Sequence, residues 1–111
     1  MAAPVVPYSE AAPTRDEVDA MAGPVLLDFG TNWCGFCQRA QPVVDQVLAA
    51  HPQVRHIKVE DGPGRALGRA FKVKLWPTLV AVQGGMELAR VSRPADAQAV
   101  AEVLTRFTPA G

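Results

Sequence analysis

The chain has 111 residues, a length that suits one compact domain, and 49% of them are hydrophobic, so one core is expected without disulfide or metal support. Its 11 acidic and 11 basic side chains balance and form no basic stripe, which argues against a nucleic-acid partner. The sequence has no segment of membrane-spanning length and no polybasic or lipidation pattern, so we expect no membrane partner.

The N-terminal segment, residues 1–13, is rich in proline and alanine. We expect it to be loosely ordered, with room for a short strand near Val5–Tyr8. It lacks the positive and the long apolar regions of a signal peptide, so we expect an uncleaved chain in a reducing cytosol. The stretch Thr14-Arg-Asp-Glu17 fits a capping box and predicts a short helix through about Ala22, which Gly23-Pro24 ends.

The next segment predicts a strand, a helix and a second strand. Val25–Phe29 is a continuous apolar run, as in a strand buried on both faces. Apolar residues at helical spacing predict a helix over Cys34–Ala50, with Asn32 as its cap and a kink at Pro42. Val54–Val59 predicts the second strand.

The C-terminal half predicts a linking helix over Arg65–Lys72 and then a hairpin. Its strands are Thr78–Val82 and Met86–Val91, joined by a turn at Gln83-Gly-Gly85. Pro94 suits the first position of a last helix, which has one apolar face.

This order, βαβ and then ββα, predicts an α/β fold. A central mixed β-sheet with helices on both faces buries the apolar faces of both halves. We expect one domain over residues 1–111.

The two cysteines, Cys34 and Cys37, form a Cys-x-x-Cys pair and are the only ones in the chain. Cys34 is predicted at the N-terminus of a helix, where free amides and the positive end of the helix dipole stabilise a thiolate. Cys37 follows one turn later on the apolar face and should be more buried. The pair therefore predicts an attacking thiolate with a second thiol behind it.

A structural disulfide is the weaker interpretation of this pair. The loop is tiny, and the stabilisation from a cross-link grows with loop length. Side chains at i and i+3 lie about 5–6 Å apart at Cβ, whereas a disulfide needs about 3.8 Å, so the bond should open readily. Redox chemistry is favoured over metal binding and over inert thiols.

A metal site would lack ligands. Zinc takes four, usually from Cys and His, and the chain offers only His51 and His56 besides the cysteines. Both histidines are expected at the surface. Only a dimer that shares two cysteine pairs would supply four sulfurs, so we expect no metal.

The sequence from about Val25 to Phe107 resembles the thioredoxin family. The stretch Asp28–Cys37 is similar to the active-site strand and turn of that family, with Phe36 in place of the usual proline between the cysteines. Further matches are the helix proline Pro42, the segment Trp76-Pro77-Thr78 and the hairpin glycine Gly85.

The resemblance implies a thioredoxin fold and a role for each matched residue. Cys34 would attack a disulfide and Cys37 would resolve the mixed disulfide, with Asp28 as a buried carboxylic acid that relays the proton of Cys37. Pro77 would follow a cis peptide bond and face the Cys34 sulfur. A substrate strand would then pair with the main chain of Trp76.

Departures from the family reshape its docking surface. Gly30 stands where a tryptophan is common, and Arg93 where a glycine is common. The expected substrate-binding residues are Trp33, Gly35, Phe36, Trp76 and Pro77. His56 or Lys58 would stand for a buried lysine of the family near the carboxyl group, although we expect both side chains to be solvated.

The resulting expectation is a thiol–disulfide oxidoreductase that reduces protein or small-molecule disulfides. It would be a cytoplasmic monomer with no bound cofactor, and its Cys34–Cys37 disulfide would be recycled by a flavoprotein reductase or glutathione. The alternatives are a disulfide oxidase or isomerase, a non-catalytic binding module, and a metal or cluster carrier.

Overall fold

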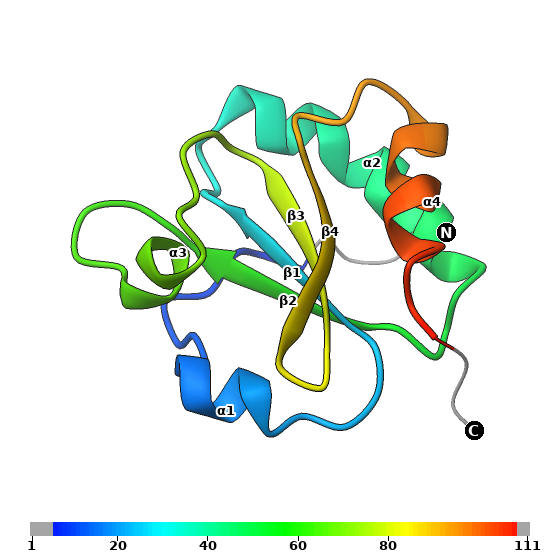
Figure 1. Ribbon diagram of the computed structural model, residues 1–111. Helices are drawn as coiled ribbons and strands as arrows, with labels where there is room; N and C mark the ends of the chain where they lie inside the picture. Colours follow the sequence, from blue (N-terminus) through cyan, green and yellow to red (C-terminus); the bar gives the residue numbers. More distant parts are fainter. Residues whose placement is uncertain (1–5, 109–111) are drawn as a thin grey trace.

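The computed structural model describes residues 6–108 and contains four helices and four strands among them (Figure 1). The elements are α1 (Arg15–Asp19), β1 (Val25–Gly30), α2 (Gly35–Ala49), β2 (Arg55–Glu60), α3 (Ala66–Ala70), β3 (Thr78–Gln83), β4 (Met86–Ser92) and α4 (Ala97–Leu104). Their order is the one that the sequence predicts, and most ends move by one to three residues.

The strands form one mixed sheet in the order β2-β1-β3-β4. β1 pairs in parallel with β2 and antiparallel with β3, and β3 pairs antiparallel with β4. Every residue of β1 is buried, as its apolar run predicts for the centre of the sheet. The hairpin between β3 and β4 turns at Gly84 and Gly85, whose φ angles of 60° and 79° suit glycine.

Helices cover both faces of this sheet (Figure 1). On one face, Leu27 and Phe29 of β1 pack with Val18 of α1 and Leu67 of α3. On the other face, Leu26 of β1 packs with the apolar sides of α2 and α4. Since side chains alternate along a strand, Asp28 lies on the same face as Leu26, towards α2.

The N-terminal segment lies along β2. Ser9 forms a parallel bridge with Val59, in which the Ser9 amide donates to Lys58 O over 3.2 Å and the Glu60 amide to Ser9 O over 3.0 Å. Tyr8 is buried, with 7% of its surface exposed. The expected strand near Val5–Tyr8 falls partly on residues 1–5, which lie outside the described residues.

Side-chain caps mark the starts of α1, α2 and α4. The capping box of α1 forms as predicted, between Thr14 and Glu17. The prediction that Asn32 caps α2 is wrong, because the Cys34 sulfur takes that place and accepts the Cys37 amide over 3.3 Å. The Asn32 side chain instead bonds the main chain of Tyr8.

The prediction that Pro94 occupies the first position of the last helix is also wrong. α4 begins at Ala97, and Asp96 is its N-cap, with a carboxylate oxygen that accepts the Ala99 amide over 2.9 Å. A side-chain acceptor satisfies a free amide of the first turn, which proline does not do.

We expect Asp96→Ala to lower the free energy of unfolding by about 1 kcal/mol, because it removes this cap. Chemical denaturation monitored by circular dichroism measures the change. Asp45→Ala is the matched control, since Asp45 is an exposed residue inside α2 and its loss leaves no amide unsatisfied. Equal stabilities of the two variants would contradict the assignment.

Candidate functional site

The two cysteines lie where the chain passes from the buried strand β1 into α2. Cys34 is the N-cap of α2 and Cys37 lies in its first turn, and both are free thiols in this structure. Cys34 is 8% exposed and Cys37 only 1%. The hydrogen bond from the Cys37 amide to the Cys34 sulfur is the type of contact that stabilises a thiolate.

Burial, together with the contact with Cys34, raises the pKa of the Cys37 thiol to about 12. The Thr31 backbone and the Tyr8 hydroxyl oppose this rise by hydrogen bonding. Cys37 is therefore protonated near neutral pH, and it needs a base before it can attack a disulfide.

Asp28 is buried behind the cysteines, as expected, with 3% of its surface exposed. The Tyr8 hydroxyl donates to Asp28 Oδ1 over 2.8 Å, and His56 Nε2 lies 2.9 Å from Asp28 Oδ2. Both oxygens of this carboxylate thus have a side-chain partner, which offsets part of the cost of burying it.

The expectation that His56 and Lys58 are solvated is wrong. In the parallel register of β1 and β2, His56 pairs with Leu26 and Lys58 with Asp28, so both side chains lie on the same face of the sheet as Asp28. His56 bonds Asp28, and Lys58 is buried with its Nζ 2.6 Å from Val6 O.

Sequence reasoning missed Tyr8, which completes the buried end of the site. A Cβ atom on Gly30 would lie 2.6 Å from Cys37 Sγ, 2.7 Å from Tyr8 Cζ and 2.9 Å from the Tyr8 hydroxyl. The absent side chain at Gly30 therefore leaves the space in which the tyrosine meets the thiol. Gly30, where the family commonly has a tryptophan, indicates from the sequence that the space beside it differs from that of the family. No sequence pattern around Tyr8 indicates that the tyrosine fills this space.

An aromatic face borders Cys34 on the outside. Trp33 is 74% exposed and meets Trp76 edge to face, with ring centroids 5.7 Å apart. Phe36 is half exposed, with the guanidinium of Arg93 3.9 Å and that of Arg39 4.8 Å from its ring centroid. An exposed apolar surface of this kind is a candidate interaction site.

The Trp76–Pro77 segment lies beside the cysteines, and its peptide bond is cis. Trp76 packs against the cluster of Tyr8, Cys34 and Cys37. Arg93 approaches the segment from the end of β4, with a φ of 50°, and its Nε donates to Trp76 O over 3.0 Å.

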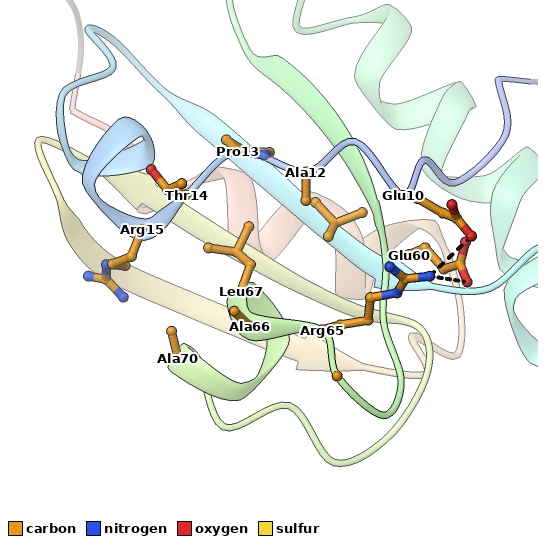
Figure 2. Close-up of a pocket in the computed structure, with 12 residues that line it drawn as sticks. Glu10, Ala12, Pro13, Thr14, Arg15, Glu60, Arg65, Ala66, Leu67 and Ala70 are labelled. Atoms are coloured by element: carbon orange, nitrogen blue, oxygen red, sulfur yellow. Dashed lines mark hydrogen bonds and ion pairs between the residues drawn. The ribbon is translucent and has the colours of Figure 1, made fainter.

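A separate hollow of about 380 Å³ lies between residues 10–15, the end of β2 and α3 (Figure 2). None of the expected site residues lines it, and Arg65 forms ion pairs with Glu10 and Glu60 at one end of it. Residues 6–108 contain no cluster of three or more metal-ligating side chains. None of their helices is long and apolar enough to cross a membrane.

Comparison with known proteins agrees with this geometry. The sequence model of the thioredoxin family, described as "Thioredoxin", matches residues 6–106. The structure of thioredoxin 2 from Pseudomonas aeruginosa PAO1 in its reduced form is 56% identical, with a TM-score of 0.80 over 89% of this chain and 92% of that one.

Two curated relatives match a shorter part of the chain. Thioredoxin C-3 of Corynebacterium nephridii is 38% identical over 62% of this chain and 48% of its own length. The bifunctional thioredoxin reductase/thioredoxin of Mycobacterium leprae is 32% identical over 61% of this chain and 15% of its own length. The chain spans about half the length of the first curated relatives that it matches.

We expect a small alkylating reagent at about pH 8 to modify Cys34 and leave Cys37 largely unmodified, since a pKa of about 12 leaves about one Cys37 in 10⁴ as thiolate. Mass spectrometry of the protein, quenched at successive times, gives the order in which the two cysteines are alkylated. In Cys34→Ser the remaining thiol should stay slow, and it should become fast in denaturant. Equal rates for the two cysteines in the folded protein would refute this difference.

Proposed function

The chain belongs to the thioredoxin family, and from this membership we propose that it is a thiol–disulfide oxidoreductase that reduces protein or small-molecule disulfides. The observation that carries the proposal is the position of Cys34 at the start of α2, with the buried Cys37 one turn behind it. The 56% identity to a reduced thioredoxin 2 supports it.

The reaction is dithiol–disulfide exchange. The Cys34 thiolate attacks one sulfur of the substrate disulfide, and the other sulfur leaves as a thiolate that takes a proton from solvent. Cys37, once deprotonated, attacks Cys34 Sγ and releases the second substrate sulfur. The substrate gains two electrons, and the protein leaves with a Cys34–Cys37 disulfide.

Asp28 is the base that we assign to the second step. Its carboxylate lies at the buried end of the site, on the side of the sheet that faces α2. The raised pKa of Cys37 makes such a base necessary.

The substrate would dock on the aromatic face and on the Trp76–Pro77 segment, where Trp33, Gly35 and Phe36 border Cys34. Strand addition to the Trp76 main chain would align the substrate disulfide with Cys34. The contact of Arg93 Nε with Trp76 O occupies an acceptor that such a strand needs. An incoming peptide must therefore displace this guanidinium.

The oxidised protein needs a reductant to act again. We propose a flavoprotein dithiol reductase as the partner that supplies electrons, with glutathione as a second donor. The chain itself would use no bound cofactor. The Mycobacterium leprae relative, whose name joins a thioredoxin reductase and a thioredoxin, supports this pairing. A reducing compartment such as the cytoplasm favours the reductive direction, and a monomer suffices for every step.

The test is reduction of insulin by dithiothreitol, followed as turbidity. We expect the wild-type protein to accelerate it and Cys34→Ser to abolish the acceleration, because the attacking sulfur is lost. Cys37→Ser should instead accumulate mixed disulfides on Cys34, visible on a non-reducing gel. Binding of partners that survives in Cys34→Ser without any turnover by the wild type would indicate a binding module instead.

We expect Arg93→Gly to increase kcat/KM for a peptide disulfide by about twofold to tenfold, the equivalent of one net hydrogen bond of about 0.5–1.5 kcal/mol. Glycine frees the Trp76 carbonyl and suits the positive φ of this position.

A small disulfide without a peptide backbone should show no change in the same assay. Arg39→Ala is the matched control, since Arg39 also lies over Phe36 but the hydrogen bond to Trp76 comes from Arg93. A lower kcat/KM for the peptide in Arg93→Gly would show that Arg93 helps substrates to bind.

A further inference from the structure

Cys37 and its base are not in direct contact. Within residues 6–108 no hydrogen bond joins Cys37 to Asp28, whose Oδ1 is bonded by Tyr8 and whose Oδ2 by His56. The group between the thiol and the carboxylate is the Tyr8 hydroxyl. It meets Cys37 in the space that Gly30 leaves free.

We propose that the Tyr8 hydroxyl carries the proton of Cys37 to Asp28, and that His56 carries it on towards solvent. This proposal rests on the proposed oxidoreductase function and assigns two further residues to its second step. Tyr8 packs with Cys37, whose sulfur reacts, in one buried cluster, and so acts as a catalytic residue. His56 acts through Asp28 as a positioning and exit residue.

The proton balance of this step is simple. The S–H bond of Cys37 breaks and its proton binds the Tyr8 oxygen, while the Tyr8 hydroxyl proton passes to Asp28 Oδ1. Tyr8 is neutral before and after the step. The Cys37 thiolate then attacks Cys34, and the substrate thiolate leaves with the electron pair of the broken S–S bond.

A tyrosine suits this role because it is held in its neutral form. Burial and the neighbouring Asp28 raise the pKa of Tyr8 far above its usual range. The residue therefore keeps a proton to donate and lone pairs to accept another. The Lys58 ammonium, 4.5 Å from the ring centroid of Tyr8, stabilises negative charge that builds on the phenol oxygen during transfer.

His56 is the residue through which the proton reaches solvent. Its side chain is 20% exposed, against 5% for Asp28, so it is the member of the chain of contacts that reaches solvent. Rotation of the protonated carboxyl group brings the proton from the oxygen that Tyr8 bonds to the oxygen beside His56 Nε2. The imidazole, in its Nδ1–H tautomer, accepts the proton on Nε2 and releases the Nδ1 proton to solvent. The titratable groups around this path are Cys34 and Cys37 at α2, Asp28 on β1, His56 and Lys58 on β2, and Tyr8 itself.

The segment that carries Tyr8 is fixed on both sides. Asn32 bonds the Tyr8 amide over 2.8 Å and the Tyr8 carbonyl over 3.2 Å. Beyond the Ser9 bridge, Glu10 is paired with Arg65, as Figure 2 shows. These contacts come from three different parts of the chain, so the hydroxyl is held in place before substrate arrives.

The test uses a small aromatic disulfide whose thiolate product is coloured, mixed with the reduced protein in a stopped-flow instrument. The first equivalent of colour reports attack by Cys34, and the second reports resolution by Cys37. We expect Tyr8→Phe to slow the second phase at least about a hundredfold at about pH 7, the low end for loss of a proton-transfer group, and to leave the first phase within about twofold.

The pH profile separates proton transfer from a structural role. The defect of Tyr8→Phe should shrink as pH rises towards the pKa of Cys37, about 12, because hydroxide then removes the proton directly. His56→Gln, which keeps a hydrogen-bond donor for Asp28, should slow the second phase with the same pH trend. Tyr8→Phe combined with Asp28→Asn should be no slower than Asp28→Asn alone.

Ser9→Ala is the matched control, since it removes an exposed hydroxyl one residue away whose partner among residues 6–108 is the Ala11 amide. It should leave both phases unchanged. A second phase of wild-type speed in Tyr8→Phe at about pH 7, or an equal slowing of both phases at every pH, would overturn the relay. If the wild-type protein releases no second equivalent, the proposed function itself fails, which is a different result.

Discussion

The buried carboxylate of Asp28 in the central strand is the constraint on which the site depends. An ionisable group without partners in that position would cost several kcal/mol, so its two oxygens must be bonded. The bonds come from Tyr8 and His56, which lie 20 residues before and 28 residues after it in the chain. The Asp28 carboxylate, which we assign as the base, therefore also links the N-terminal segment to β2.

Features that depend on neighbours in the sequence were predictable. The continuous apolar run at Val25–Phe29 indicates a strand buried on both faces, and the capping box at Thr14 indicates the start of α1. The spacing of the two cysteines, with a strand directly before them, places Cys34 at a helix start. The fold class follows from the order of these elements, because each apolar face needs a cover.

Features that depend on register and on distant contacts were not predictable in the same way. The face on which His56 lies is decided by its pairing with Leu26, and a shift of one residue would turn it to the other side of the sheet. The starts of α2 and α4 depended on which side chain reaches a free amide, and Asn32 was already engaged by Tyr8. Tyr8 itself lies in a proline-rich stretch whose sequence carries no periodic signal.

Burial keeps Cys37 protonated, yet Cys37 must lose its proton before it can resolve the mixed disulfide. The neighbouring groups meet both requirements. A thiol with a pKa near 12 is almost entirely protonated near neutral pH, so Cys37 by itself is a poor nucleophile. The same pKa would make the resolving step slow if the proton had to leave through bulk water. A hydroxyl and a carboxylate inside the protein remove the proton without exposing the sulfur. Gly30 leaves the space in which Tyr8 reaches Cys37. The departure from the family at this position therefore allows the N-terminal segment, folded along β2, to bring Tyr8 into the site.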